Sequence, residues 1–193
     1  MRPFVLFLSA SLIATAAWAG ADFGARNPAP IAPMSGMILY RDARYGFTIA
    51  YPPHWAVNAA FRRDIGPVIH GVSFTVSAEV TQGTNLASDT KLSVEHVDGR
   101  CHAGRFLDSP TDEHDVTDGA HGYSMASTQD AGAGNRYEET VYAFAHGGTC
   151  FGIRYFIHYG AIQNYDPGTV KAFDHDALTA AFDRMRRSLS FNR

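Results

Sequence analysis

The chain has 193 residues, a formal charge of −3 at neutral pH and two cysteines. Basic and acidic side chains are interspersed, so the chain lacks the basic stripe that nucleic-acid binding requires. Positive charge is concentrated only at Arg184, Arg186 and Arg187, in the last turns of a predicted helix, where cations complement the helix dipole. We therefore expect no nucleic-acid partner.

Residues 1–19 have the pattern of a Sec-type signal peptide. An apolar run follows Arg2, and the small residues Ala17 and Ala19 flank Trp18 in an A-x-A arrangement. The run is shorter than the roughly 20 apolar residues of a transmembrane helix, and no second such run follows. We expect cleavage after Ala19 and a periplasmic or secreted protein without a membrane span.

The next segment, residues 20–36, is rich in Ala, Pro and Gly without periodicity, and it predicts a flexible N-terminal arm. Residues 37–193 suit a single domain. Its first two β-prone runs, residues 37–40 and 47–51, are separated by a charged turn containing Gly46 and predict a hairpin. Further strands are predicted at three places: residues 68–76, 91–97 and 123–128.

A second hairpin is the clearest feature of the later sequence. Two long β-prone runs meet at His146-Gly147-Gly148-Thr149, and in the second run side chains alternate between two faces. The face of Phe151, Ile153, Tyr155, Ile157 and Tyr159 is predicted core. The opposite face is mixed, and we predict from it an interaction surface formed by three residues: Arg154, Phe156 and His158.

The C-terminal segment changes to a helical period. Apolar residues recur at helical spacing from Leu178 to Leu189, and Asp174 or Asp176 can cap the N-terminus. A shorter helix is predicted near Cys101. Strands, a helix, more strands and a final helix indicate an α+β domain, in which the last helix lies on the sheet.

The two cysteines, Cys101 and Cys150, predict a disulfide because an exported chain with an even number of cysteines favours pairing. A shared metal site would need further ligands, and a catalytic thiol would need an electropositive setting. We expect a structural role.

The segment from Tyr40 to Trp55, YRDARYGFTIAYPPHW, resembles the YxxxxxGFxxxYPxxW opening of PsbP-like and Mog1-like domains. The segment from Arg186 to Phe191, RRSLSF, is similar to the end of the last helix and the short terminal strand of that fold. The resemblance implies an α+β fold in which an antiparallel sheet lies between helices, an α/β/α sandwich. It also implies a function in binding a partner rather than in catalysis.

Candidate metal ligands lie between residues 102 and 121. His102, His114 and His121 are interspersed with carboxylates, and imidazole with carboxylate suits a divalent transition metal. No H-E-x-x-H or EF-hand spacing is present, and a Pro- and Asp-rich stretch is typical of a solvated loop.

The sequence therefore favours an exported, non-enzymatic accessory protein of the bacterial cell envelope, with another envelope or secreted protein as its partner and no cofactor. The alternative is a periplasmic metal-binding protein or metal-dependent enzyme that uses the segment from His102 to His121.

Overall fold

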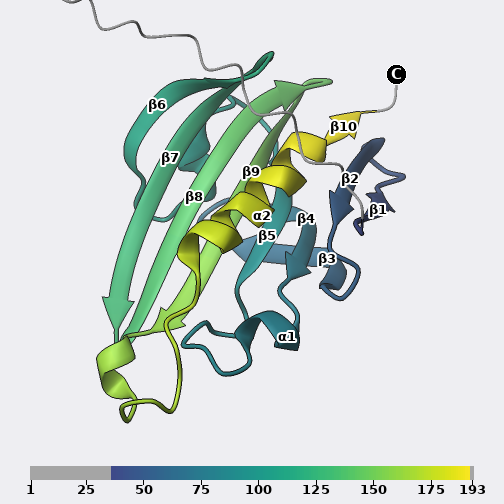
Figure 1. The fold of residues 1–193 in the computed structure, drawn as a ribbon. Helices are drawn as coiled ribbons and strands as arrows, with labels where there is room; N and C mark the ends of the chain where they lie inside the picture. The colour runs from purple at the N-terminus through teal and green to yellow at the C-terminus, as the bar shows by residue number, and fades with distance from the viewer. Residues whose placement is uncertain (1–35, 192–193) are drawn as a thin grey trace, which may run out of the picture. The chain divides into compact units, whose positions relative to one another are not determined.

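The computed structural model describes residues 36–191, in which most of the chain forms antiparallel β-sheet (Figure 1). The predicted arm and signal peptide lie outside this range, except for Gly36. The strands are β1 (Ile38–Arg41), β2 (Phe47–Tyr51), β3 (Ala56–Asp64), β4 (Val68–Thr75), β5 (Lys91–Val97), β6 (Thr111–Asp118), β7 (His121–Gly132), β8 (Asn135–His146), β9 (Thr149–Gly160) and β10 (Ser190–Phe191). The helices are α1 (Ala78–Thr81) and α2 (His175–Ser188), with the 3₁₀ turns η1 (Ala103–Phe106) and η2 (Ile162–Asn164).

Seven of these strands form one sheet in the order β3-β4-β5-β9-β8-β7-β6. The four strands β6 to β9 follow one another as hairpins, and the predicted hairpin at His146 and Thr149 is the β8–β9 connection. Pairing of β5 with β9 joins the earlier strands to this meander, with Leu92 opposite Tyr155. Every pair in the sheet is antiparallel, as predicted.

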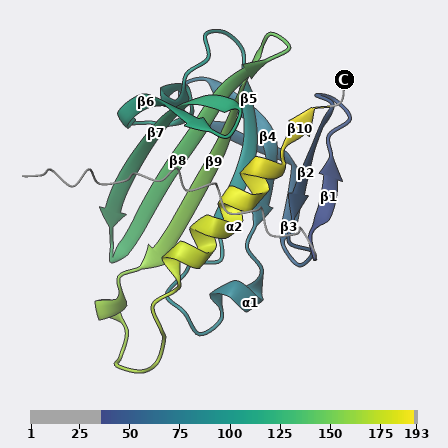
Figure 2. The same ribbon diagram turned by 45° about the horizontal axis from the view of Figure 1, so that its top comes forward.

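The remaining strands form a small sheet in the order β1-β2-β10. Strand β10 pairs with β2, and the hydroxyls of Thr48 and Ser190 lie 2.8 Å apart. Figure 2 shows this small sheet beside one end of α2. The predicted first hairpin and the terminal strand are therefore both present.

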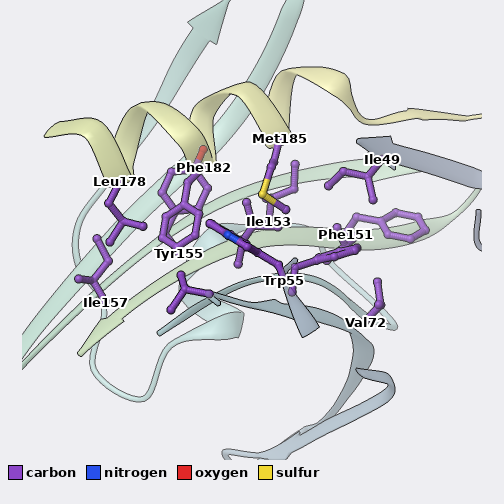
Figure 3. Close-up of a cluster of buried hydrophobic side chains, with 14 of the residues drawn as sticks. Ile49, Trp55, Val72, Phe151, Ile153, Tyr155, Ile157, Leu178, Phe182 and Met185 are labelled. Atoms are coloured by element: carbon purple, nitrogen blue, oxygen red, sulfur yellow. The ribbon is translucent and has the colours of Figure 1, made fainter. Parts of the chain in front are cut away.

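Helix α2 covers one face of the large sheet. Asp174 caps its N-terminus by accepting a hydrogen bond from the Ala177 N–H at 2.9 Å. Its side chains Leu178, Phe182 and Met185 are buried against the apolar side chains of β9, as Figure 3 shows. The predicted core face of β9 is thus the face on which the helix packs.

Trp55, which follows β2 closely, helps to close this core. Its indole is 7% exposed and meets the Phe182 ring edge-on, with 5.7 Å between ring centroids. Phe182 also contacts Tyr155 on β9. Aromatic rings bury more apolar area than other side chains, so this contact fixes the end of β2 against α2.

The opposite face of the large sheet has much less cover. The turn η1 packs there, and a second core cluster forms around Phe106 between η1 and five strands, β4, β5, β7, β8 and β9. The predicted short helix near Cys101 is therefore a single 3₁₀ turn. The α+β class holds, whereas the second helical layer of the expected sandwich is reduced to this turn among the described residues.

Two edge strands occupy segments where the sequence predicted none. Strand β3 has nine residues, of which seven are exposed, and β6 falls on the stretch that looked like a solvated loop. Side chains on both faces of these strands meet solvent, so neither segment alternates between apolar and polar residues.

Candidate functional site

Cys101 and Cys150 form a disulfide, the pairing that the sequence predicted. Their Cα atoms lie 4.9 Å apart, and the bond ties the start of the η1 segment to the first residues of β9. Cys150 is buried, with 1% of its surface exposed. The disulfide therefore anchors η1 on the sheet, which is a structural role.

A buried ion network lies on the same face, next to η1. The Glu95 carboxylate is 0% exposed and accepts hydrogen bonds from Arg63 at 2.9 Å and from the Ser93 hydroxyl at 2.6 Å. Arg154 faces Glu95 across the β5–β9 pair, with its Nη1 3.7 Å from Glu95 Oε1. Its Nε donates to Glu139 on β8. Two cations and two carboxylates thus balance one another inside the sheet face.

The half-buried side chains beyond this network form what we call the open face: Lys91, Tyr137, Phe156 and His158. Phe156 lies between two cations, with Lys91 Nζ 4.6 Å and the Arg154 guanidinium 4.9 Å from its ring centroid. Tyr137 stacks on the His158 ring at 4.4 Å. Cross-strand pairing places these residues side by side on β5, β9 and β8. None of the helices in residues 36–191 packs over them.

Hydrogen bonds fix the orientation of two open-face side chains. His158 Nδ1 is 2.7 Å from Asp89 Oδ1 and its Nε2 is 3.1 Å from Asn135 Oδ1, so both ring nitrogens are engaged. Lys91 donates to the Asp89 carbonyl at 2.9 Å. Burial lowers the pKa of Lys91, and the neighbouring Asp89 opposes that shift. The open face therefore presents rigid rings and a cation in fixed positions.

The three predicted surface residues fall at different depths. Phe156 and His158 reach the surface, but Arg154 is 4% exposed and lies in the ion network beneath them. The prediction that Arg154 contacts a partner directly is therefore corrected, because the side chain is buried. Its guanidinium instead packs against the inner side of the Phe156 ring. Lys91 and Tyr137 were missed because strand pairing, which a single strand does not reveal, places them beside Phe156.

The predicted metal ligands separate into two groups. His102 and His114 line one cavity of about 520 Å³ together with Glu113 and Asp115, whereas His121 lies elsewhere, beside His146. His102 Nδ1 lies 3.0 Å from Glu113 Oε1. Within residues 36–191, no group of three His, Cys, Asp or Glu side chains is arranged to hold a metal ion.

Glu113 in that cavity already has protein partners. Its Oε1 accepts a hydrogen bond from the Ser124 hydroxyl at 3.1 Å in addition to the contact with His102. Burial opposes ionisation, but the hydrogen bonds from Ser124, the Gly104 N–H and His102 together lower the pKa of Glu113. The carboxylate therefore acts as a link between β6, β7 and η1.

Comparisons with known proteins concern the fold. No protein-family model and no curated protein sequence matches the chain. Among solved structures, the chain is similar to the solution structure of cyanobacterial PsbP (CyanoP) from Synechocystis sp. PCC 6803, with a TM-score of 0.47 and 13% identity. The match covers 88% of this chain and 100% of that one.

Proposed function

We propose that this protein is an exported, non-enzymatic accessory protein that binds another protein of the cell envelope through the open face. The observation that carries the proposal is the fixed arrangement of Phe156, Tyr137 and Lys91 on the large sheet, outside the two core clusters that α2 and η1 cover. Aromatic rings in fixed positions bind a partner with little loss of conformational entropy, and they are enriched at interfaces.

The buried ion network supports this reading. A buried network of Glu95, Arg63 and Arg154 costs desolvation energy, and apolar side chains of similar size would fill the same space without that cost. Here the network places the Arg154 guanidinium against the inner side of the Phe156 ring. The charged layer thus holds the aromatic surface in a defined position.

The chemistry of the open face indicates the partner. Its two rings, Phe156 and Tyr137, offer flat apolar contacts, while Lys91 brings a positive charge beside them. A complementary surface carries apolar side chains around a carboxylate that approaches Lys91. We expect such a surface on a folded envelope or secreted protein.

Two further observations support export. The disulfide between Cys101 and Cys150 is of the kind that persists in oxidising compartments. The leader-like residues 1–19 have the signal-peptide pattern described above. Separately from export, no helix of residues 36–191 is long and apolar enough to cross a membrane.

Photo-crosslinking in the periplasm tests the proposal. A benzoylphenylalanine at position 137 replaces one aromatic residue by another and should crosslink one defined protein. The same group at the exposed position 184 on α2 serves as the matched control and should not crosslink that protein. Phe156→Ala with Lys91→Ala should abolish the crosslink while the protein remains folded.

Crosslinking of the same protein from both positions, or a product that survives the double substitution, would contradict a role for the open face. Elemental analysis of the same purified protein tests the metal-binding alternative. A stoichiometric transition metal that is lost in His102→Ala with His114→Ala would favour that alternative.

A further inference from the structure

A second surface, on the other face of the large sheet, has the composition of a small-molecule site. We call it the basic cleft: a cavity of about 580 Å³ whose wall carries four basic side chains, His121, His146, Arg186 and Arg187. The residues come from the start of β7, the end of β8 and the last turn of α2. A volume of this size is typical of sites for small ligands.

The carboxylates near the cleft lie behind its wall. Asp118 Oδ2 accepts hydrogen bonds from Arg186 at 2.7 Å and from Arg187 at 2.8 Å, and Asp183 accepts from Arg186 at 3.2 Å. Neither aspartate lines the cleft, and its described lining contains no carboxylate. The acidic groups therefore hold the two guanidinium groups in place, and the ionisable side chains that line the cavity itself are basic apart from Tyr123.

Arg186 retains unused hydrogen-bonding capacity. The residue is 3% exposed, its Nε donates to the Tyr155 hydroxyl at 2.9 Å, and its guanidinium stacks on the Tyr142 ring at 4.2 Å. Its Nη1 is buried without a hydrogen-bond partner among the described residues. Most buried donors are paired, so this nitrogen is an unusual feature of a residue that also lines the cavity. Arg187 lies beside it with a side chain that is 45% exposed.

Three aromatic side chains, Tyr123, Phe144 and Phe191, also line the cleft. Phe191 on β10 stacks on the His146 ring at 3.8 Å and meets Phe144 at 5.9 Å, and Tyr123 meets Phe144 edge-on at 5.8 Å. An inorganic anion has no apolar surface to bury against these rings. A ligand that matches both parts carries one negative group and an apolar body.

We propose that the basic cleft binds a small amphipathic carboxylic acid in its ionised form. Its carboxylate group would lie at Arg186 and Arg187, and its aromatic or aliphatic body would lie against Phe144 and Phe191. This site is separate from the open face and independent of the proposed partner. Its ligand is defined by charge and apolar surface together, so each can be removed alone in a test.

Titration of the mature protein with 3-phenylpropionate, followed by backbone amide NMR shifts, tests the proposal. Shifts should be confined to residues 120–123, 144–146 and 186–191. Two matched probes separate the contributions: 3-phenylpropanamide keeps the body without the charge, and inorganic phosphate keeps a charge without the body. Each should bind at least tenfold more weakly, because a hydrogen bond to a charged group and the apolar contact each contribute about that factor.

Arg187→Gln should weaken 3-phenylpropionate binding at least tenfold, whereas Arg184→Gln, an exposed change on the same helix, should leave it within twofold. Because Arg187 also bonds Asp118, His146→Glu provides a second test that spares that ion pair; it places a carboxylate in the wall and should abolish binding. Equal affinity for the amide, equal affinity for phosphate, or equal losses in the two arginine variants would overturn the proposal.

Discussion

Glu95 shows at the scale of one residue how the sheet face is organised. Its carboxylate has no exposed surface, yet Arg63, Arg154 and Ser93 surround it. A buried ion pair of this kind contributes little net stability, but removing one partner leaves the other charge buried and uncompensated, which is costly. Its substitution is therefore more damaging than its net contribution suggests.

Glu95→Gln should lower the free energy of unfolding by about 3 kcal/mol, because it leaves the two arginines without their shared carboxylate inside the protein. Urea denaturation measures the change. Glu79→Gln on the exposed surface of α1 is the control and should change stability by less than about 0.5 kcal/mol. Equal effects of the two substitutions would contradict the buried-network interpretation.

Asp118 predicts how stability depends on pH. Hydrogen bonds from Arg187 lower its pKa most, burial opposes them, and Arg186 lowers it further. The pKa in the folded chain thus lies below the ordinary value of about 4, so the ion pair stabilises the fold above that pH and is lost as the pH falls through the lowered pKa. The stability difference between wild type and Asp118→Asn should therefore shrink between about pH 5 and about pH 2.

Urea midpoints of the two proteins across this range measure that difference. Asp166→Asn, in an exposed loop, is the control and should follow the wild-type curve at every pH. Parallel curves for wild type and Asp118→Asn would show that Asp118 makes no pH-dependent contribution.

At the scale of elements, η1 is positioned by one close contact and one covalent bond. The Phe106 ring lies flat over Gly152 on β9, where an added Cβ would meet three ring carbons at 2.9 Å. Arg63 donates to the Phe106 carbonyl at 2.6 Å from the other side. The turn therefore sits closer to the sheet than a side chain at position 152 would permit.

Gly152→Ala should lower the free energy of unfolding by about 1 to 3 kcal/mol, because the ring and the new methyl group cannot occupy the same space. Phe106→Leu removes the ring, so Gly152→Ala should cost less stability in the Phe106→Leu background than in the wild-type protein. Thermal or urea unfolding of the four proteins gives the coupling energy. Strict additivity would show that the contact does not limit this position.

The disulfide makes the same connection covalent. It spans 49 residues, so its removal should cost on the order of 4 kcal/mol of stability in the simplest chain-entropy model. Cys150→Ser should lower the melting temperature markedly, and non-reducing peptide mapping should recover Cys101 linked to Cys150. Two free, alkylatable thiols in protein taken from the periplasm would contradict the link.

Sequence reasoning succeeded where one face of an element is buried. Strand β9 and helix α2 alternate with clear periods, and the turn at Gly147 has the residues that a hairpin needs. It failed for β3 and β6, whose exposed side chains leave no period to read. For the open face, alternation identified Phe156 and His158, whereas the burial of Arg154 depends on Glu95 and on η1, which are distant in the chain.

At the scale of the whole molecule, export remains a prediction from residues 1–19, which lie outside the described part of the chain. N-terminal sequencing of protein from the periplasm should begin at Gly20, or at Asp22 if the neighbouring small residues are used instead. Replacing Ala17 and Ala19 with bulky residues should block processing. A mature protein that retains Met1 would show that the segment is not a signal peptide.

The pairing of β2 with β10 has a consequence for the order of events during synthesis. Thr48 and Ser190 are 142 positions apart, so a chain that emerges N-terminus first holds β2 without its second neighbour until those last residues appear. Strand β5 likewise can pair with β9 only after β9 has emerged. Such distant pairings form slowly because the intervening chain must close first. The hairpins of consecutive strands can therefore form early, whereas both sheets are completed only after β9 and β10 have emerged.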